Sequence, residues 1–527
     1  MMGSAKSQWV FWCFLTKFTR NSLTLLLSVV LLSDAVGATP RGTPLQMPET
    51  TQQNATRAAA ERVFDEGMQL YQQGTAESLR QAIAKWQEAL KLWQQVDDKS
   101  GEAVTLLGIG RVYDSLGEKQ EALKYYNQAL PIFRAVGDRR MEAITLNDIG
   151  LVYDSLGEKQ EALKYYNQAL PISRAVGDRG VEAGTLNNIG LVYDSLGEKQ
   201  EALKYYNLAL PISRAVGNRG GEADTLNNIG FVYSDLGENQ EALKYYNQAL
   251  SISRAVGDRG GEAITLNNIG LVYSDLGEKQ EALKYYNQAL PILRAVGDRG
   301  MEATTLNSIG LVYSDLGEKQ EALKYYNQAL PIYRAVGDRR GGATTLNSIG
   351  LVYDSLGEKQ EALKYYNLAL PISRAVGNRR GEASILNNIG GVYSSLGEKQ
   401  EALKYYNLAL PISRAVGNRR GEASILNNIG GVYSSLGEKQ QALKYYNQAL
   451  TISSAVGNRG GEVSTLSNIG SIYSSLGEKQ QALKYFNQAL TISSAVGDRG
   501  GEAITLNNIG GVYSLLGEKQ EALKYYN

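Results

Sequence analysis

Apolar residues recur along this chain in a pattern that repeats every forty residues from Gly101 onward. Each copy contains two runs with steps of three and four residues. In the copy that begins at Glu142, the first run is Ala143, Leu146, Ile149, Gly150, Tyr153 and Leu156. The second run is Ala162, Leu163, Tyr166, Ala169, Leu170, Ile172 and Val176. These steps place the apolar side chains on one helix face, so each copy predicts a pair of amphipathic helices.

Small and capping residues predict where the helices end and how closely they pack. A glycine such as Gly157 follows each run, and glycine readily takes the left-handed conformation that closes a helix. Asp178 is suited to cap the next helix through its carboxylate. Gly150 lies in mid-helix, where it costs up to ~1 kcal/mol relative to alanine. We therefore expect the paired helix to approach too closely for a side chain there, with Tyr153 and Tyr166 in the core.

A fixed period of this length is typical of a solenoid, in which each unit buries its apolar face only against its neighbours. The copy from Glu361 to Gln400 is identical to the copy from Glu401 to Gln440, which indicates recent duplication. A candidate site residue in such an array recurs along a long surface, whereas an enzyme needs one convergent pocket. The repeat therefore favours a binding surface over a catalytic centre.

The first 38 residues form an export-like leader. Basic residues precede an apolar run at 23–32, and small residues follow it up to Ala38. This run is too short to span a hydrocarbon core of ~30 Å. We expect cleavage after Ala38 and export to the periplasm or the outside of the cell. Because a second apolar stretch lies at 9–15, an uncleaved membrane anchor is an alternative, and a cytoplasmic protein is a third.

The remaining chain divides by composition and period. Residues 39–57 are rich in Pro, Thr and Gln without an apolar period, so they are expected to form a flexible linker. Residues 58–100 form a divergent N-terminal helical repeat, in which Gly67 and Trp86 hold comparable places. Residues 101–527 form the tandem array, whose last unit is incomplete.

Several positions recur in every unit at a fixed spacing. They are Leu146-x2-Ile149-Gly150-x2-Tyr153, followed by Ala162-x3-Tyr166-x2-Ala169. This spacing resembles the tetratricopeptide repeat, although the period is forty residues instead of thirty-four. Arg174 also stands where that family usually has its closing proline. The resemblance implies an all-α fold, a right-handed α-solenoid of stacked helical hairpins.

Two longer sequence features resemble those of particular groups within this family. Leu-Asn-Asn in the first helix and Gly-Asp-Arg at the junction resemble the repeats of kinesin light chains and of Pins-type spindle-orientation adaptors. They also resemble the arrays that precede caspase-like (CHAT) domains in bacterial proteins. With an export-like leader, the bacterial relatives are the nearer comparison.

Composition removes most catalytic classes. Fifty-four basic side chains balance 54 acidic ones without a long run of one sign, so the basic footprint of a nucleic-acid binder is absent. The chain has no histidine, the commonest general base and metal ligand at neutral pH. Its only cysteine, Cys13, lies in the leader. We expect no catalytic residues, no metal site, no cofactor and no nucleic-acid partner.

One stripe on each first helix is separate from the packing face. Asn147, Leu151 and Asp154 share it, and we place it on the inner, concave wall. An amide offers both a donor and an acceptor, so a row of amides is suited to bind the backbone of an extended peptide. The resemblance to the kinesin and Pins-type arrays implies the same role. The candidate asparagines are Asn147, Asn187, Asn227, Asn267, Asn307, Asn347, Asn387, Asn427 and Asn507. The apolar candidates beside them are Leu151, Leu191, Phe231 and Leu271.

A second interpretation of these asparagines stays open at this point: they bond neighbouring helices or water. Variation along the stripe is more informative than repetition. Glycine replaces Leu151 at Gly391, Gly431 and Gly511, which predicts a groove that is apolar toward the N-terminal half and smoother toward the C-terminal half. An N-terminal fragment should then bind a partner peptide better than a C-terminal fragment.

Together these patterns predict a non-catalytic scaffold for protein–protein interaction, with a protein or peptide as partner. Because the sequence stops partway through a second helix, the recognition arm of a larger CHAT-type protease, truncated at its C-terminus, is an alternative. End-to-end self-association is a third reading. Membrane contact is expected only if residues 1–38 remain as an anchor.

Overall fold

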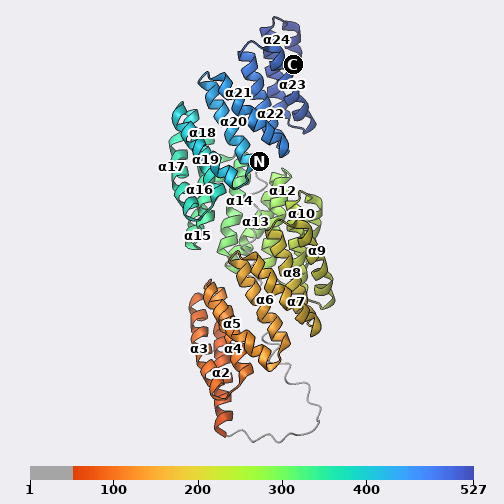
Figure 1. Ribbon diagram of the computed structural model, residues 1–527, viewed down its shortest axis with the longest axis vertical. Coiled ribbons are helices and arrows are strands. Elements are labelled where there is room, and N and C mark those ends of the chain that lie inside the picture. Colours follow the sequence, from red (N-terminus) through yellow and green to blue (C-terminus); the bar gives the residue numbers. More distant parts are fainter. Residues whose placement is uncertain (1–50, 527) are drawn as a thin grey trace. The chain divides into compact units, whose positions relative to one another are not determined.

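A computed structural model describes residues 51–526 of the chain. The leader expected at 1–38, with its cleavage or anchoring role, and residues 39–50 of the expected linker lie outside this range. All regular structure within the described range is α-helical (Figure 1). These residues belong to two compact units, one that ends at Met301 and one that starts at Glu302.

The helices alternate as first (even-numbered) and second (odd-numbered) members of hairpins. In the first unit they are α2 (Thr51–Gln73), α3 (Ala76–Gln95), α4 (Lys99–Ser115), α5 (Lys119–Val136), α6 (Arg139–Ser155), α7 (Lys159–Ala175), α8 (Arg179–Ser195), α9 (Lys199–Ala215), α10 (Arg219–Asp235), α11 (Asn239–Ala255), α12 (Arg259–Asp275) and α13 (Lys279–Val296). Helix α14 (Arg299–Asp315) contains the division between the units. The second unit continues with α15 (Lys319–Ala335), α16 (Arg339–Ser355), α17 (Lys359–Ala375), α18 (Arg379–Ser395), α19 (Lys399–Ala415), α20 (Arg419–Ser435), α21 (Lys439–Ala455), α22 (Arg459–Ser475), α23 (Lys479–Ala495), α24 (Arg499–Leu515) and α25 (Lys519–Tyr526).

The turns between helices form as their sequences predict. Gly157 follows α6 with φ of +82°, a conformation that residues with a Cβ rarely adopt. Asp178 precedes α8, and its carboxylate accepts a hydrogen bond from the Val181 amide at 3.0 Å. That bond satisfies one of the amides left without a partner at a helix N-terminus. Both the closing glycine and the capping aspartate are confirmed.

Close packing within each hairpin explains the glycine in the middle of the first helix. A Cβ added at Gly150 would lie 2.5 Å from Cε1 of Tyr166, whose ring is buried. The divergent first repeat has the same glycine–aromatic contact, since a Cβ at Gly67 would lie 2.5 Å from Cδ1 of Trp86. The expected close approach is therefore confirmed in both kinds of repeat.

Tyr153 is less buried than we expected for a core residue. It is only half-buried and stacks on Tyr165 of the next helix, with ring centroids 5.3 Å apart. Lys164 places its ammonium 5.8 Å from the Tyr165 centroid. The core prediction holds fully for Tyr166, while Tyr153 packs against the edge of the core and remains partly exposed.

The helical region starts earlier than we expected. Helix α2 begins at Thr51, so residues 51–57 are helical, and the prediction of a flexible linker is wrong for them. They extend the first helix of the divergent repeat, in which Ala60 and Phe64 are buried. A Pro-poor stretch that continues directly into an apolar helix face accounts for the difference.

First helices of consecutive repeats contact one another directly. In the first unit α6 contacts α8, α8 contacts α10 and α10 contacts α12; in the second unit the contacts run from α16 to α24 in the same way. Consecutive second helices make at most marginal contact within either unit. Because the first helices approach one another more closely, they form the inner side of the stack within each unit.

Candidate functional site

The asparagines expected to line the inner wall lie on first helices, where they face the next first helix. Their exposure changes along the chain. Asn187, Asn227 and Asn267 are buried, Asn147, Asn307, Asn347, Asn387 and Asn427 are half-buried, and Asn507 is exposed. The candidates are thus brought into one row within each unit, but they are not equally accessible.

The amide oxygens of most of this row accept a hydrogen bond from the following repeat. In the second unit, Nδ2 of Asn388 donates to Oδ1 of Asn347 at 3.0 Å, and Nδ2 of Asn428 donates to Oδ1 of Asn387 at 3.0 Å. Asn468 bonds Asn427 in the same way at 3.1 Å. The first unit repeats the arrangement with the pairs Asn188–Asn147, Asn228–Asn187 and Asn268–Asn227, at 3.2, 3.1 and 3.2 Å. These bonds tie adjacent first helices together.

The second asparagine of each Leu-Asn-Asn was not among the predicted site residues. Its signal was present in the sequence, because Leu-Asn-Ser replaces Leu-Asn-Asn at Ser308 and Ser348. Asn307, whose partner position is Ser348, instead accepts a hydrogen bond from the Thr345 hydroxyl at 3.0 Å. The bond between repeats therefore depends on the identity of this second residue.

This bonding changes the chemistry expected of the row. Since Oδ1 accepts from the neighbouring repeat, the amide is oriented, and its NH2 group is directed away from that bond as a donor for a ligand. In the second unit the Nδ2 groups of Asn347, Asn387 and Asn427 donate to no described residue. Half-buried donors with a fixed orientation are suited to bind carbonyl oxygens.

The apolar candidates lie one helical turn after the asparagines. Leu151 is buried, whereas Leu191, Phe231 and Leu271 are half-buried. The Phe231 ring also receives the ammonium of Lys199 from the preceding repeat, 5.8 Å from its centroid. Leu191, Phe231 and Leu271 thus present partly exposed apolar side chains beside the asparagines of the first unit.

Arg111 and Asp148 form an ion pair at the N-terminal end of this wall. Nε of Arg111 lies 2.6 Å from Oδ2 of Asp148, and the two side chains are only 11% and 13% exposed. Burial raises the pKa of Asp148 above its usual range, although the Arg111 charge opposes that shift. The pair takes the places of a leucine and an asparagine in later repeats, so this end of the wall is polar.

Asp154 does not line the wall, and its placement on the shared stripe is wrong. Its side chain is 2% exposed and lies 2.6 Å from Nζ of Lys159 in the hairpin turn. Burial raises the pKa of Asp154, and Lys159 opposes that shift. The three-residue step from Leu151 turns this position from the inner wall toward the second helix.

At several junctions the glutamate in the first turn of a first helix is clamped between two arginines. Glu182 is 3% exposed, and its Oε1 lies 2.8 Å from Nε of Arg174 at the end of the preceding helix. Arg179, three residues before Glu182, bonds the other carboxylate oxygen at 2.5 Å. One guanidinium for each oxygen fixes the junction between hairpins.

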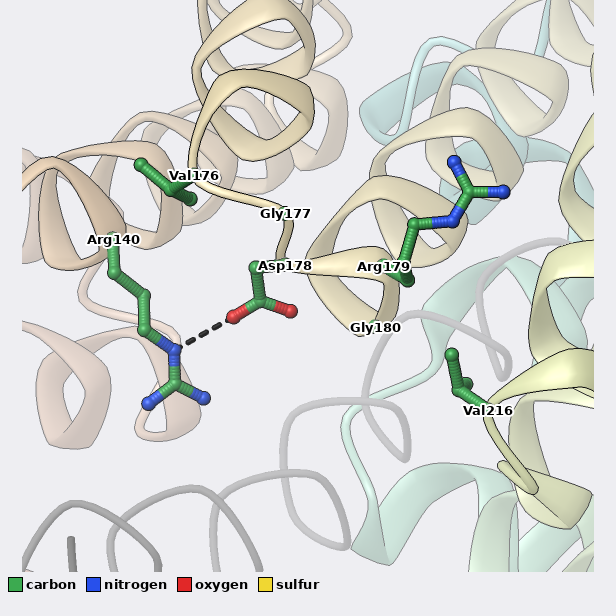
Figure 2. Close-up of a pocket in the computed structure, with 7 residues that line it drawn as sticks. All are labelled: Arg140, Val176, Gly177, Asp178, Arg179, Gly180 and Val216. Atoms are coloured by element: carbon green, nitrogen blue, oxygen red, sulfur yellow. Dashed lines mark hydrogen bonds and ion pairs between the residues drawn. The ribbon is translucent and has the colours of Figure 1, made fainter.

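A shallow hollow lies on the surface at this junction (Figure 2). It has a volume of about 480 Å³, and Arg140, Val176, Asp178 and Val216 are among its lining residues. Figure 2 shows the Arg140 guanidinium directed at Asp178, with Nε 2.6 Å from Oδ2. Both charges are thereby compensated within the protein.

No group of three or more His, Cys, Asp or Glu side chains within 51–526 is arranged to hold a metal ion. In the same range, no helix combines the length and apolarity that crossing a membrane requires.

Solved structures show where this fold occurs elsewhere. The apo quorum sensor NprR from B. thuringiensis matches with a TM-score of 0.51 and 20% identity, over 68% of this chain and 99% of that one. A Rap protein complexed with Competence and Sporulation Factor matches with a TM-score of 0.48 and 17% identity, over 68% of this chain and 99% of that one. A signal-transduction ATPase with a tetratricopeptide repeat sensor from Pyrococcus horikoshii matches with a TM-score of 0.46 and 17% identity, over 62% of this chain and 52% of that one.

Sequence comparison identifies the family. No curated protein matches the chain. None of the similarities singles out the kinesin-light-chain, Pins-type or CHAT-associated arrays. The family model described as tetratricopeptide repeat matches residues 74–135, 120–175, 141–215, 221–295, 299–375, 381–455 and 461–527. The chain belongs to the tetratricopeptide repeat family.

Proposed function

We propose that the chain is a non-catalytic scaffold for protein–protein interaction, and that its inner wall binds an extended segment of a partner protein. The observation that supports this most is the row of oriented amides at Asn347, Asn387 and Asn427. Each oxygen is held by the next repeat, and each NH2 group lacks a partner among the described residues.

Such a row of donors forms hydrogen bonds with the main chain of a ligand and makes few contacts with its side chains. Every residue of an extended segment carries a carbonyl acceptor, so donors repeated along the wall bind it with little dependence on sequence. The half-buried Leu191, Phe231 and Leu271 add a preference for apolar side chains in the first unit. We therefore propose that an N-terminal fragment binds a partner peptide better than a C-terminal fragment.

The proposal is tested by removing the donors without removing the bonds between repeats. The full chain is used to select peptides from a displayed library, and the affinity of a selected peptide is measured by fluorescence anisotropy. The variant N347D/N387D/N427D keeps an oxygen for each bond from the next repeat but loses the NH2 groups. Because each lost hydrogen bond contributes about 0.5–1.5 kcal/mol, we expect binding to weaken at least about tenfold.

A matched control carries the same three charges elsewhere. Asn367, Asn407 and Asn447 are exposed residues on the second helices of the same repeats. N367D/N407D/N447D should bind the peptide like the wild type. An inner-wall variant with unchanged affinity, or an equal loss in both variants, would contradict the proposal.

A further inference from the structure

The carboxylate clamp described for Glu182 recurs at several junctions, with which a junction that lacks the glutamate can be compared. The clamped residues are Glu142, Glu182, Glu222, Glu262, Glu382 and Glu422. All are between 2% and 4% exposed. In each, an arginine eight residues earlier places Nε 2.8–2.9 Å from Oε1, and an arginine three residues earlier bonds Oε2.

One junction in the second unit keeps both arginines but lacks the glutamate. Arg334 lies in the last turn of α15 and Arg339 begins α16, while Gly342 stands at the glutamate position. Neither arginine makes an ion pair with any described residue. The guanidinium groups that bind a carboxylate in six other junctions are therefore left without one here.

A side chain can start at Gly342 without a clash. A Cβ added at Gly342 would have Cδ1 of Leu330 and Cβ of Tyr333 as its nearest neighbours, both at 4.0 Å. Ordinary van der Waals contact at that distance leaves room for a side chain to start. The glycine is therefore not required by a close approach, in contrast to Gly150.

Tyr333 also differs from the serine found in most repeats, but it is compatible with a clamped carboxylate. The equivalent residue before Glu142 is Phe133, which is fully buried while Glu142 keeps both arginines. The Tyr333 hydroxyl lies 3.4 Å from Oγ1 of Thr304. An aromatic ring at this position thus leaves the carboxylate position available.

We propose that Arg334, Arg339 and Gly342 form a binding site for a carboxylate supplied by another molecule, such as an acidic side chain of a partner protein. The ligand takes the position that the glutamate side chain holds in other junctions, with one guanidinium on each oxygen. The site uses none of the inner-wall asparagines, so it is independent of the proposed peptide binding.

Propionate is the appropriate probe, because it has the atoms of a glutamate side chain with hydrogen in place of Cα. Its binding to the full chain is measured by saturation-transfer difference NMR at constant ionic strength. Propionamide has the same shape without the charge and serves as the control ligand. We expect a saturable propionate signal, a signal at least fivefold weaker for propionamide, and roughly threefold weaker propionate binding in R334Q or R339Q.

Two substitutions at the glutamate position separate the site from adventitious binding to surface arginines. G342E supplies the carboxylate from within and should abolish the saturable signal. E382G removes the carboxylate between Arg374 and Arg379, and should add a second site with similar affinity. Circular dichroism verifies that both variants keep their helical content.

Several results would overturn the assignment. They are an unchanged propionate signal in G342E, an equal signal with propionamide, and tighter binding of inorganic phosphate than of propionate. If E382G does not fold, the comparison of propionate binding to wild type and to G342E still tests the assignment, because G342E restores the residue found at every other junction of the array.

Discussion

At the scale of single residues, the same amino acid has opposite consequences at two positions of one helix. Gly190 and Gly184 both lie within α8. A Cβ at Gly190 would lie 2.6 Å from Cε1 of Tyr206, whereas a Cβ at Gly184 would meet nothing within 4 Å. Steric demand explains the first glycine, and only helix propensity acts at the second.

This contrast gives a paired prediction for alanine substitution. G190A should lower the free energy of unfolding by about 1–3 kcal/mol, because the Tyr206 ring has to move within a packed core. G184A should raise it by up to about 1 kcal/mol, because alanine is the better helix former. Urea unfolding followed by circular dichroism measures both. Equal effects of the two substitutions would contradict the close-packing explanation.

Buried tyrosines make stability depend on alkaline pH. Burial raises the pKa of Tyr406 to about 12 in the folded protein, above the ordinary value near 10 that applies after unfolding. Its contribution to stability is therefore complete below pH 10. Between pH 10 and 12 the unfolded chain ionises first, so that contribution is lost as pH rises.

Replacement of Tyr406 by phenylalanine should remove this dependence. Phe486 already occupies the equivalent position of a later repeat and is buried, so the substitution preserves the packing. We expect the wild type to lose up to about 1 kcal/mol more per pH unit than Y406F above pH 10. Urea unfolding of both proteins at pH 9, 10 and 11 measures the difference. A difference that does not change with pH would contradict the assignment.

At the scale of helices, the junctions are fixed by side chains that serve two purposes. Asp178 caps α8 through the Val181 amide and also binds Arg140 from α6 (Figure 2). Asn218 and Asn378 cap later helices at the same place without the charge. Capping is therefore general to the junctions, and the ion pair is an addition.

The two contributions at Asp178 can be separated by substitution. D178A removes both, and we expect it to lower the free energy of unfolding by about 1–2 kcal/mol. D178N keeps a capping oxygen, as Asn218 does, and should lose less than about 1 kcal/mol. Thermal unfolding of the two variants provides the comparison. If D178N were as destabilised as D178A, the ion pair and not the cap would dominate.

Local spacing was sufficient to predict the helical hairpins, the closing glycines, the aspartate cap and the Gly150–Tyr166 contact. Each of these features depends on residues in the same hairpin or at its boundary. The bond from Asn188 to Asn147 spans one repeat and one extra residue, so it depends on how neighbouring helices are rotated against each other. That rotation is set by tertiary packing, which is why the sequence left two roles open for the asparagines.

At the scale of the whole molecule, nearly identical repeats make the interfaces between hairpins interchangeable. The copies at 361–400 and 401–440 are identical and lie within the second unit. Removal of residues 361–400 joins Gln360 to Glu401 and recreates every local sequence and every neighbouring pair. In an array with nearest-neighbour stabilisation, such a deletion shortens the stack without breaking it.

We therefore expect the chain lacking residues 361–400 to keep its helical content per residue, with a thermal midpoint within about 5 °C of the wild type. A chain lacking residues 361–380 is the control, because it places two first helices in succession and leaves their apolar faces unmatched. This control should lose helical content or aggregate. Similar behaviour of the two deletions would contradict stacking of hairpins in register.

The central claim is that oriented amides of the inner wall hold the main chain of a partner segment. A crystal structure of the full chain with a peptide selected on it tests this most directly. We predict main-chain carbonyl oxygens of the peptide within hydrogen-bond distance of Nδ2 of Asn347, Asn387 and Asn427, while each Oδ1 keeps its bond to the next repeat. A peptide bound along the second helices, or one that displaces the bonds between asparagines, would contradict the account.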